Sequence, residues 1–179
     1  LSKLVQAILI VSKVEKGVLA FDQELKAESA DISSGSGTLY KTIGDNPMTV
    51  ENLLKELLVN SDNTAQNIFK HHLSVDDYIG FQYETGLQDL YNEKGFISAK
   101  EYTRILRVLY ISSFLEPENS EKILELLSRS TFKDYLSQGI PSNIKFAHKY
   151  GENIEYSIFA DSGIVYVPDK PYLITVIIK

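Results

Sequence analysis

The sequence predicts an α+β fold in which a helical lobe packs on an antiparallel sheet. Apolar residues recur at helical spacing through most of the first 139 residues, and after Pro141 the pattern changes to that of strands. The chain has 179 residues, which is enough to bury one core. We therefore expect one domain over 1–179, with the helical lobe at 1–139 and a three-stranded antiparallel sheet at 143–179.

The first half of the lobe contains three expected helices. Residues 2–16 are apolar on most sides and stop at Gly17, a residue typical of a helix end. After a loop rich in Ser, Gly and Asp at 28–47, Thr49 caps a helix with an apolar stripe. That helix breaks near 60–62, and a further helix is expected from Asn63 to about His72.

The second half of the lobe contains three more expected helices. A short helix at 75–84 ends at Gly86. The sequence 98–101, Ser-Ala-Lys-Glu, is a capping box that opens a helix with Tyr102, Ile105, Leu106 and Leu109 on one stripe. Pro117 occupies the first turn of the last helix.

Three strands are expected at 143–150, 155–167 and 171–178, the last two joined by a turn that contains two prolines. Both faces of the final strand are mostly apolar, so both need a covering layer. The helical lobe can cover one face. We expect segments outside this chain, or a partner chain, to cover the other.

Composition excludes several classes of function. There are 18 Lys and Arg against 24 Asp and Glu, so the net charge is −6 and nucleic acid is a poor partner. The absence of cysteine excludes disulfide scaffolds, thiol catalysis and Cys-ligated metals. The apolar run at 4–11 is too short to span a membrane, and charged residues continue it.

Two short motifs carry candidate chemistry. Polar residues at 60–64, Asn-Ser-Asp-Asn-Thr, interrupt an apolar helical region, and taken alone they are typical of a helix N-cap. Lys149 interrupts the first strand within His-Lys-Tyr-Gly at 148–151, and taken alone it is typical of an edge-strand lysine that discourages aggregation.

Together, in this chain order, the two motifs resemble the Ser-Asp-Asn and Lys-Thr-Gly elements of the class A β-lactamase-like family, within the serine β-lactamase and penicillin-binding protein superfamily. The resemblance extends over nearly the whole chain. Gly35-Ser36-Gly37 is similar to the loop that precedes the Ser-Asp-Asn helix, and the segment 161–166 is similar to the strand after Lys-Thr-Gly. The resemblance implies the β-lactamase/transpeptidase-like fold.

The resemblance also implies the roles of individual residues. Lys3 matches the lysine of the family's Ser-x-x-Lys motif and would activate the nucleophile, because burial in an apolar helix lowers the pKa of an amine. Ser61 would relay a proton to the leaving nitrogen, and Asn63 would hold Lys3 and the substrate amide. Lys149 would supply positive charge near Ser61 and the substrate carboxylate, so these three segments are expected to converge on one cleft.

The family's nucleophilic serine would then lie one position before Leu1. We therefore expect the 179 residues to be a partial domain that lacks the first strands, the nucleophile and the last helix. Two internal Ser-x-x-Lys matches, at Ser130 and Ser142, lie between the other motifs and so have the wrong chain order. We reject both as nucleophiles.

The chain departs from the family in its substrate-binding residues and in deacylation. Tyr150, which precedes Gly151, replaces a small hydroxyl residue that in the family helps to bind the substrate carboxylate. Glu152, whose N–H would complete the oxyanion hole, puts a charge where a small residue is usual. No convincing Glu-x-x-Leu-Asn motif is present, because Gly86-Leu87 aligns better with a helix end, so a long-lived acyl-enzyme is expected.

The resemblance implies a serine hydrolase that acts on β-lactam amides through an acyl-serine, with no metal and no cofactor. Two alternatives remain: a peptidoglycan DD-peptidase of the penicillin-binding type, or an inactive relative that binds cell-wall peptide or protein. The family implies an extracytoplasmic protein, either secreted or anchored. Adjacent His71 and His72 lie about 100° apart on a helix and do not predict a metal site.

Overall fold

The computed structural model describes residues 2–88, 90 and 97–179. Its elements form two compact units, Ser2–Tyr78 and Ile79–Lys179, with helix α4 (Val75–Thr85) crossing the boundary between them. The predicted α+β class is confirmed. No helix among the described residues is long and apolar enough to cross a membrane.

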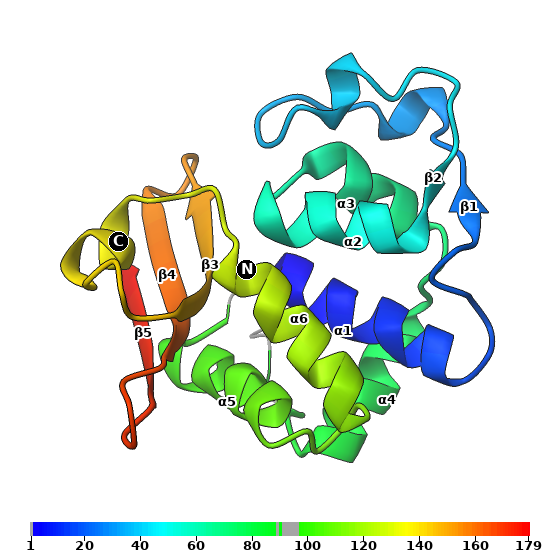
Figure 1. Ribbon diagram of the computed structural model, residues 1–179. Coiled ribbons are helices and arrows are strands. Elements are labelled where there is room, and N and C mark those ends of the chain that lie inside the picture. Colours follow the sequence, from blue (N-terminus) through cyan, green and yellow to red (C-terminus); the bar gives the residue numbers. More distant parts are fainter. Residues whose placement is uncertain (1, 89, 91–96) are drawn as a thin grey trace. The chain divides into compact units, whose positions relative to one another are not determined.

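The first unit is built on three helices, α1 (Ser2–Glu15), α2 (Val50–Val59) and α3 (Asn63–Lys70), which pack on one another (Figure 1). Helix α1 is buried from Lys3 to Ser12, as its apolar composition predicts. It ends where Gly17 takes a left-handed conformation with φ of 69°. Thr49 caps α2 by accepting the N–H of Asn52 at 3.3 Å, which confirms the predicted start.

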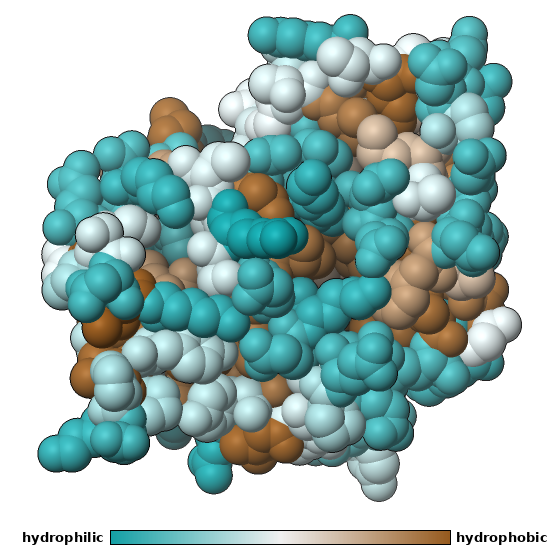
Figure 2. Space-filling model, viewed as in Figure 1, coloured by the Kyte–Doolittle hydropathy of each residue, from teal (hydrophilic) through white to brown (hydrophobic). Residues whose placement is uncertain are grey.

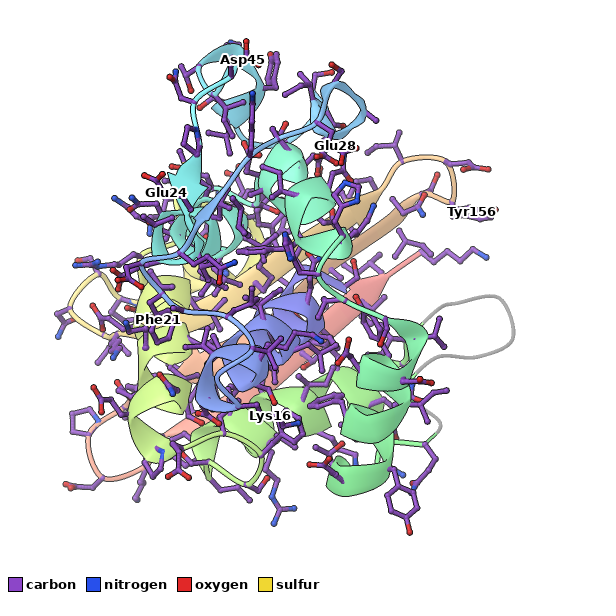
Figure 3. The ribbon with its side chains drawn as sticks, turned by 90° about the vertical axis from the view of Figure 1, so that its right-hand side faces the viewer. Lys16, Phe21, Glu24, Glu28, Asp45 and Tyr156 are labelled. Carbon is purple, nitrogen blue, oxygen red and sulfur yellow. The ribbon has the colours of Figure 1, made fainter. Side chains whose placement is uncertain are left out.

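The connection between α1 and α2 contains elements that periodicity does not reveal. Two short strands, β1 (Glu24–Leu25) and β2 (Met48–Thr49), pair antiparallel, and two 3-10 turns occur at Ser29–Asp31 and Leu39–Lys41. Figure 3 follows this connection from Lys16 through Phe21 and Glu24 to Glu28. Strands of two residues are too short to show alternation, so the sequence predicts only a loop.

The second unit contains helices α5 (Ala99–Tyr110) and α6 (Pro117–Ser128) and the sheet β3 (Phe146–Asn153), β4 (Ile158–Val165) and β5 (Tyr172–Ile178). The strands are antiparallel in the order β3–β4–β5, as predicted. The first strand begins at Phe146 instead of residue 143. Ser98 caps α5 by accepting the N–H of Glu101, and Pro117 opens α6.

The final strand has one covered and one exposed face. Thr175 of β5 lies 2.6 Å from Thr103 of α5, hydroxyl to hydroxyl, so this face meets a helix. On the other face Tyr172, Val176 and Ile178 are 47%, 37% and 60% exposed. Apolar side chains are visible at the left-hand edge of Figure 2, where β5 lies in Figure 1. The predicted uncovered apolar face is therefore present among the described residues.

Candidate functional site

Lys3 is the centre of a polar cluster inside the apolar first unit. Its side-chain amine donates to Oδ1 of Asn63 at 2.7 Å, to Oγ of Ser61 at 3.2 Å and to the Ser61 carbonyl. The residue is only 8% exposed. Burial lowers the pKa of Lys3 to about 8, against an opposing contribution from Asp62, and Lys70 lowers it slightly further. A fraction of about a tenth is therefore neutral near pH 7.

The Ser-Asp-Asn segment is a tight link between α2 and α3. Ser61 takes a left-handed backbone conformation with φ of 53°, which is uncommon for a residue with a side chain. Asp62 is fully buried, and its carboxylate accepts the N–H of Ala65 at 3.0 Å and of Leu39 at 2.9 Å. Asp62 therefore caps α3, and this cap holds Ser61 and Asn63 on either side of it.

The loop that contains Gly35-Ser36-Gly37 packs directly against this link. The Ser36 carbonyl accepts the N–H of Asn63 at 3.0 Å, and the Ser34 carbonyl accepts the Asn63 side-chain amide at 2.9 Å. Gly37 has φ of 75°, and a Cβ there would overlap the Asp62 side chain. The glycine is therefore required by backbone conformation and by close approach.

Lys149 on β3 is buried, with 1% of its surface exposed. Its amine donates to the Tyr150 carbonyl at 3.1 Å and lies 4.3 Å from the Tyr150 ring centroid. The strand does lie at an edge of the described sheet. A lysine that discourages aggregation must expose its charge, so the burial of Lys149 rules out that interpretation.

Tyr150 and Glu152 are held by an aromatic segment that precedes the sheet. The rings of Phe132 and Tyr150 stack at 3.7 Å and 10°. The hydroxyl of Tyr135 donates to Oε1 of Glu152 at 2.5 Å, and this hydrogen bond raises the pKa of Tyr135 to about 12. Gly151 pairs with Ala160 in the ladder between the two residues. Sequence analysis missed Phe132 and Tyr135 as contacts of the predicted substrate-binding residues.

The structure therefore brings together Lys3, Ser61 and Asn63 within the first unit, and it places Lys149, Tyr150, Gly151 and Glu152 along β3 of the second unit. The roles assigned to all seven residues, and the convergence of Lys149 with the first group, stay predictions. The three-residue cluster joins positions about sixty apart in the sequence.

The candidate deacylation segment ends a helix. Gly86 has φ of 68° after α4, and its carbonyl accepts Nη2 of Arg104 at 2.9 Å. This confirms that Gly86-Leu87 is a helix end. Glu93, a carboxylate that follows this segment in the sequence, lies outside the described residues.

Histidine does not form a metal cluster in the part of the chain that the structure describes, where no group of three or more His, Cys, Asp or Glu side chains could hold a metal ion. His71 instead lies 2.8 Å from Oδ1 of Asp31, which is buried at the end of the first 3-10 turn. His71 therefore joins the end of α3 to the preceding loop while its ring stays partly exposed.

Comparison with known proteins identifies relatives over the whole chain. A family model described as the β-lactamase enzyme family matches residues 1–179. A search of curated proteins found no match.

Solved structures of two kinds have the same fold. A β-lactamase from Sphaerobacter thermophilus is 19% identical with a TM-score of 0.86, and the match covers 98% of this chain and 71% of that protein. PBP-A is 20% identical with a TM-score of 0.85 over 98% of this chain and 69% of that protein. A variant of PBP-A, solved as an acyl-enzyme complex with penicillin G, is 18% identical with a TM-score of 0.82 over the same shares.

Proposed function

The chain belongs to the β-lactamase enzyme family, and on that premise we propose that it forms part of a serine hydrolase that opens β-lactam amides through an acyl-serine. The observation that carries the proposal is the Lys3 amine, which is buried, has a pKa of about 8 and contacts both Ser61 and Asn63. A lysine in this state can accept a proton near neutral pH.

In the proposed acylation step, neutral Lys3 takes the proton of the nucleophilic serine as its oxygen bonds to the lactam carbonyl carbon. The family pattern puts that serine one position before Leu1. When the carbon–nitrogen bond breaks, Ser61 donates its hydroxyl proton to the leaving nitrogen and recovers a proton from the Lys3 ammonium. The 3.2 Å separation of Lys3 Nζ and Ser61 Oγ supports this transfer.

Asn63 is proposed to orient the amine and to bind the substrate amide. Its Oδ1 accepts from Lys3, while its amide nitrogen donates to the Ser34 carbonyl, so the side chain is fixed at both ends. Because Asn63 is fixed in this way, its Oδ1 orients the Lys3 amine.

Residues of β3 are proposed to bind the substrate. Lys149 supplies a positive charge for a carboxylate, the N–H of Glu152 completes an oxyanion hole with that of the nucleophile, and Gly151 lets the substrate approach the strand. The Tyr150 ring narrows this region, and the Glu152 carboxylate adds a negative charge to it. Both effects support slow turnover of anionic β-lactams.

A DD-peptidase of the penicillin-binding type is the second candidate. The PBP-A variant that has this fold was solved as an acyl-enzyme with penicillin G. In the present chain the segment that imitates a deacylation motif instead ends α4 at Gly86. A protein that acylates and deacylates slowly with β-lactams suits a peptidase, whose natural substrate is an acyl-D-Ala-D-Ala peptide. Either activity is expected outside the cytoplasm.

Intact-mass spectrometry of the full-length protein with a chromogenic cephalosporin tests the proposal. We expect an adduct of one β-lactam that persists, because a missing general base slows deacylation by about 10²–10⁴-fold. Lys3→Met should prevent the adduct, whereas Lys55→Met, at an exposed position on α2, should leave it unchanged. Rapid turnover without an adduct would contradict slow deacylation, and neither turnover nor adduct would favour an inactive binding protein.

A further inference from the structure

A second group of catalytic residue types lies in the second unit, whereas the Lys3 cluster belongs to the first unit. Oγ of Ser137 lies 3.3 Å from Nε2 of His148, and Nδ1 of His148 lies 2.8 Å from Oδ1 of Asp161. We propose that Ser137, His148 and Asp161 form a nucleophilic site that hydrolyses short-chain carboxylic esters, independent of the proposed β-lactam chemistry.

The order of contacts is that of a serine–histidine–aspartate relay. A carboxylate only accepts hydrogen bonds, so Nδ1 of His148 carries the proton toward Asp161. The lone pair of Nε2 then faces the Ser137 hydroxyl, as general-base activation of a serine requires. The polarity of the two contacts therefore matches the chemistry.

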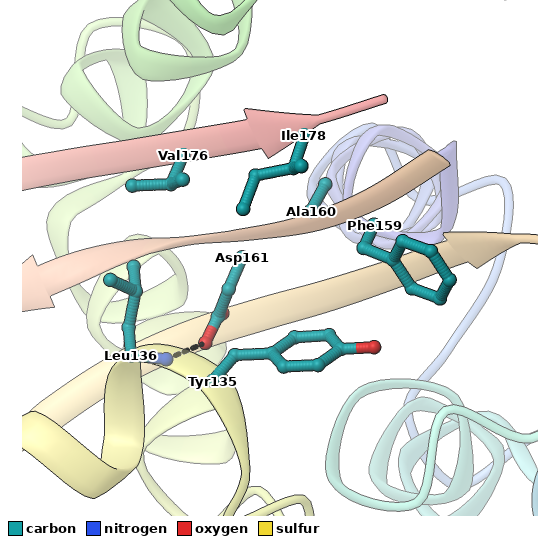
Figure 4. A pocket seen from close by; sticks show the side chains of 7 residues that line it. All are labelled: Tyr135, Leu136, Phe159, Ala160, Asp161, Val176 and Ile178. Atoms are coloured by element: carbon teal, nitrogen blue, oxygen red, sulfur yellow. Dashed lines mark hydrogen bonds between the residues drawn. The ribbon is translucent and has the colours of Figure 1, made fainter. Parts of the chain in front are cut away.

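The histidine and aspartate are rigidly held. His148 and Asp161 are each 2% exposed and lie on the paired strands β3 and β4. The His148 ring stacks on Phe146 at 4.4 Å and 15°. The second oxygen of Asp161 accepts the N–H of Leu136 at 3.3 Å (Figure 4). Burial strengthens the electrostatic coupling between the pair, and the fixed ring lowers the reorganisation that proton transfer needs.

The serine is placed by a strained turn. Ser137 lies in the 3-10 helix Tyr135–Gly139, which begins with Tyr135 in a left-handed conformation at φ of 56°. This conformation is retained because the Tyr135 hydroxyl donates to Glu152 and the N–H of Leu136 donates to Asp161. Contacts on both strands therefore hold the backbone of the turn that carries Ser137.

Ser137 and His148 both line an open cavity of about 390 Å³. The lining of the cavity is mixed: besides polar residues it includes the apolar side chains of Ile140 and Ile144 and the basic side chain of Lys133. The apolar side chains suit a short acyl chain, and a basic side chain in the same cavity favours the negative charge that develops on the carbonyl oxygen. An ester is favoured over an amide because an alkoxide is a better leaving group than an amine anion.

The reaction balances without a further reactant except water. Ser137 Oγ bonds to the ester carbonyl carbon while its proton moves to Nε2 of His148. The carbon–alkoxy bond then breaks, and the leaving oxygen takes that proton, which leaves an acyl-serine and an alcohol. The oxygen of a water molecule then bonds to the acyl carbon while one water proton moves to Nε2 of His148. The bond between the acyl carbon and Ser137 Oγ breaks, Oγ takes that proton, and a carboxylic acid leaves.

The competing explanation is a structural bracket, in which the same contacts only attach the 3-10 helix to the sheet. A bracket requires no reactivity at Ser137. A fluorophosphonate probe, which phosphonylates activated serines, separates the two explanations because peptide mapping by mass spectrometry identifies the labelled residue in the unaltered protein.

We expect a phosphonate on Ser137, separate from any label on the serine that Lys3 is proposed to activate. Ser137→Ala should abolish the label at this position and lower the hydrolysis of p-nitrophenyl acetate. Ser142→Ala, which alters another serine of the same cavity, should retain both. Asp161→Asn should slow labelling by at least about tenfold, since loss of the carboxylate in a serine relay can cost up to about 10⁴-fold.

Melting curves will establish that each variant is folded. Folded, unaltered protein that carries no phosphonate on Ser137 would overturn the proposal, and so would equal labelling of Ser142. A folded Asp161→Asn variant that labels at the unaltered rate would also overturn it. Because the label is located by mapping, reaction at Ser137 is distinguished from acylation by β-lactams.

Discussion

The Lys3 amine lies 2.7 Å from Oδ1 of Asn63, although sixty residues separate the two positions in the sequence. The neutral amide oxygen of Asn63 accepts a hydrogen bond from either the ammonium or the neutral amine of Lys3, because both forms carry N–H groups. It adds no negative charge beside the amine. The low pKa that burial gives Lys3 is therefore preserved by the choice of Asn over Asp at this position.

The first prediction concerns the pH dependence of acylation. Lys3 must be neutral to accept a proton, so the second-order rate of β-lactam acylation should rise with pH and level off above about 8. Asn63→Asp should move this midpoint upward, because a carboxylate beside the amine stabilises the ammonium. Stopped-flow acylation across pH gives both midpoints, and an unchanged midpoint in the variant would exclude Lys3 as the titrating base.

The second prediction concerns stability. The pKa of Lys3 is about 8 in the folded chain and 10.5 when exposed, so between these values the unfolded chain binds more protons. The free energy of unfolding should therefore rise as pH increases from 8 toward 10.5, by at most about 3 kcal/mol. Lys3→Met should be more stable than the unaltered protein at pH 7 and should lose this part of the pH dependence.

Chemical denaturation at pH 7 and pH 9.5 measures the effect. Lys55→Met, on the exposed side of α2, is the matched control and should retain the pH dependence of the unaltered protein. If Lys3→Met were less stable at pH 7, the cost of burying this amine would have been misjudged.

The third prediction concerns the loop against Asp62. Gly37→Ala places a Cβ into the Asp62 side chain at a left-handed backbone position, and we expect a loss of stability of about 2–4 kcal/mol. Gly44→Ala has the same backbone cost, at φ of 48°, but nothing within 4 Å of its Cβ, so about 1–2 kcal/mol is expected. Equal losses in denaturant melts would show that contact with Asp62 is unimportant.

The fourth prediction concerns Tyr150. Tyr150→Thr removes a bulky ring from the strand that is proposed to bind substrate and should speed acylation by anionic β-lactams. It also removes the stack on Phe132, so stability should fall by about 1 kcal/mol or more. Tyr83→Thr, at a position that is 78% exposed, should change neither quantity. Slower acylation in the folded Tyr150→Thr variant would indicate that the ring assists binding.

The sequence by itself determined the class of fold and most of the elements. Thr49, Ser98 and Pro117 mark helix starts through local hydrogen bonding and fixed backbone angles, and Gly17 and Gly86 mark helix ends in the same way. Alternation after Pro141 predicted the three strands. These signals are local, so a pattern within one turn or a few residues is enough to read them.

Only the tertiary structure decided which distant side chains meet. No periodicity in the sequence relates Lys3 to Asn63, or the short strands β1 and β2 to each other. Only the family resemblance linked Lys3 to the motif around residue 61. The sequence did not indicate that Ser137 and Asp161 contact His148, because these contacts arise from the pairing of β3 with β4 and from the turn at Tyr135. Packing of separate segments fixes such distances, and local propensity carries no information about them.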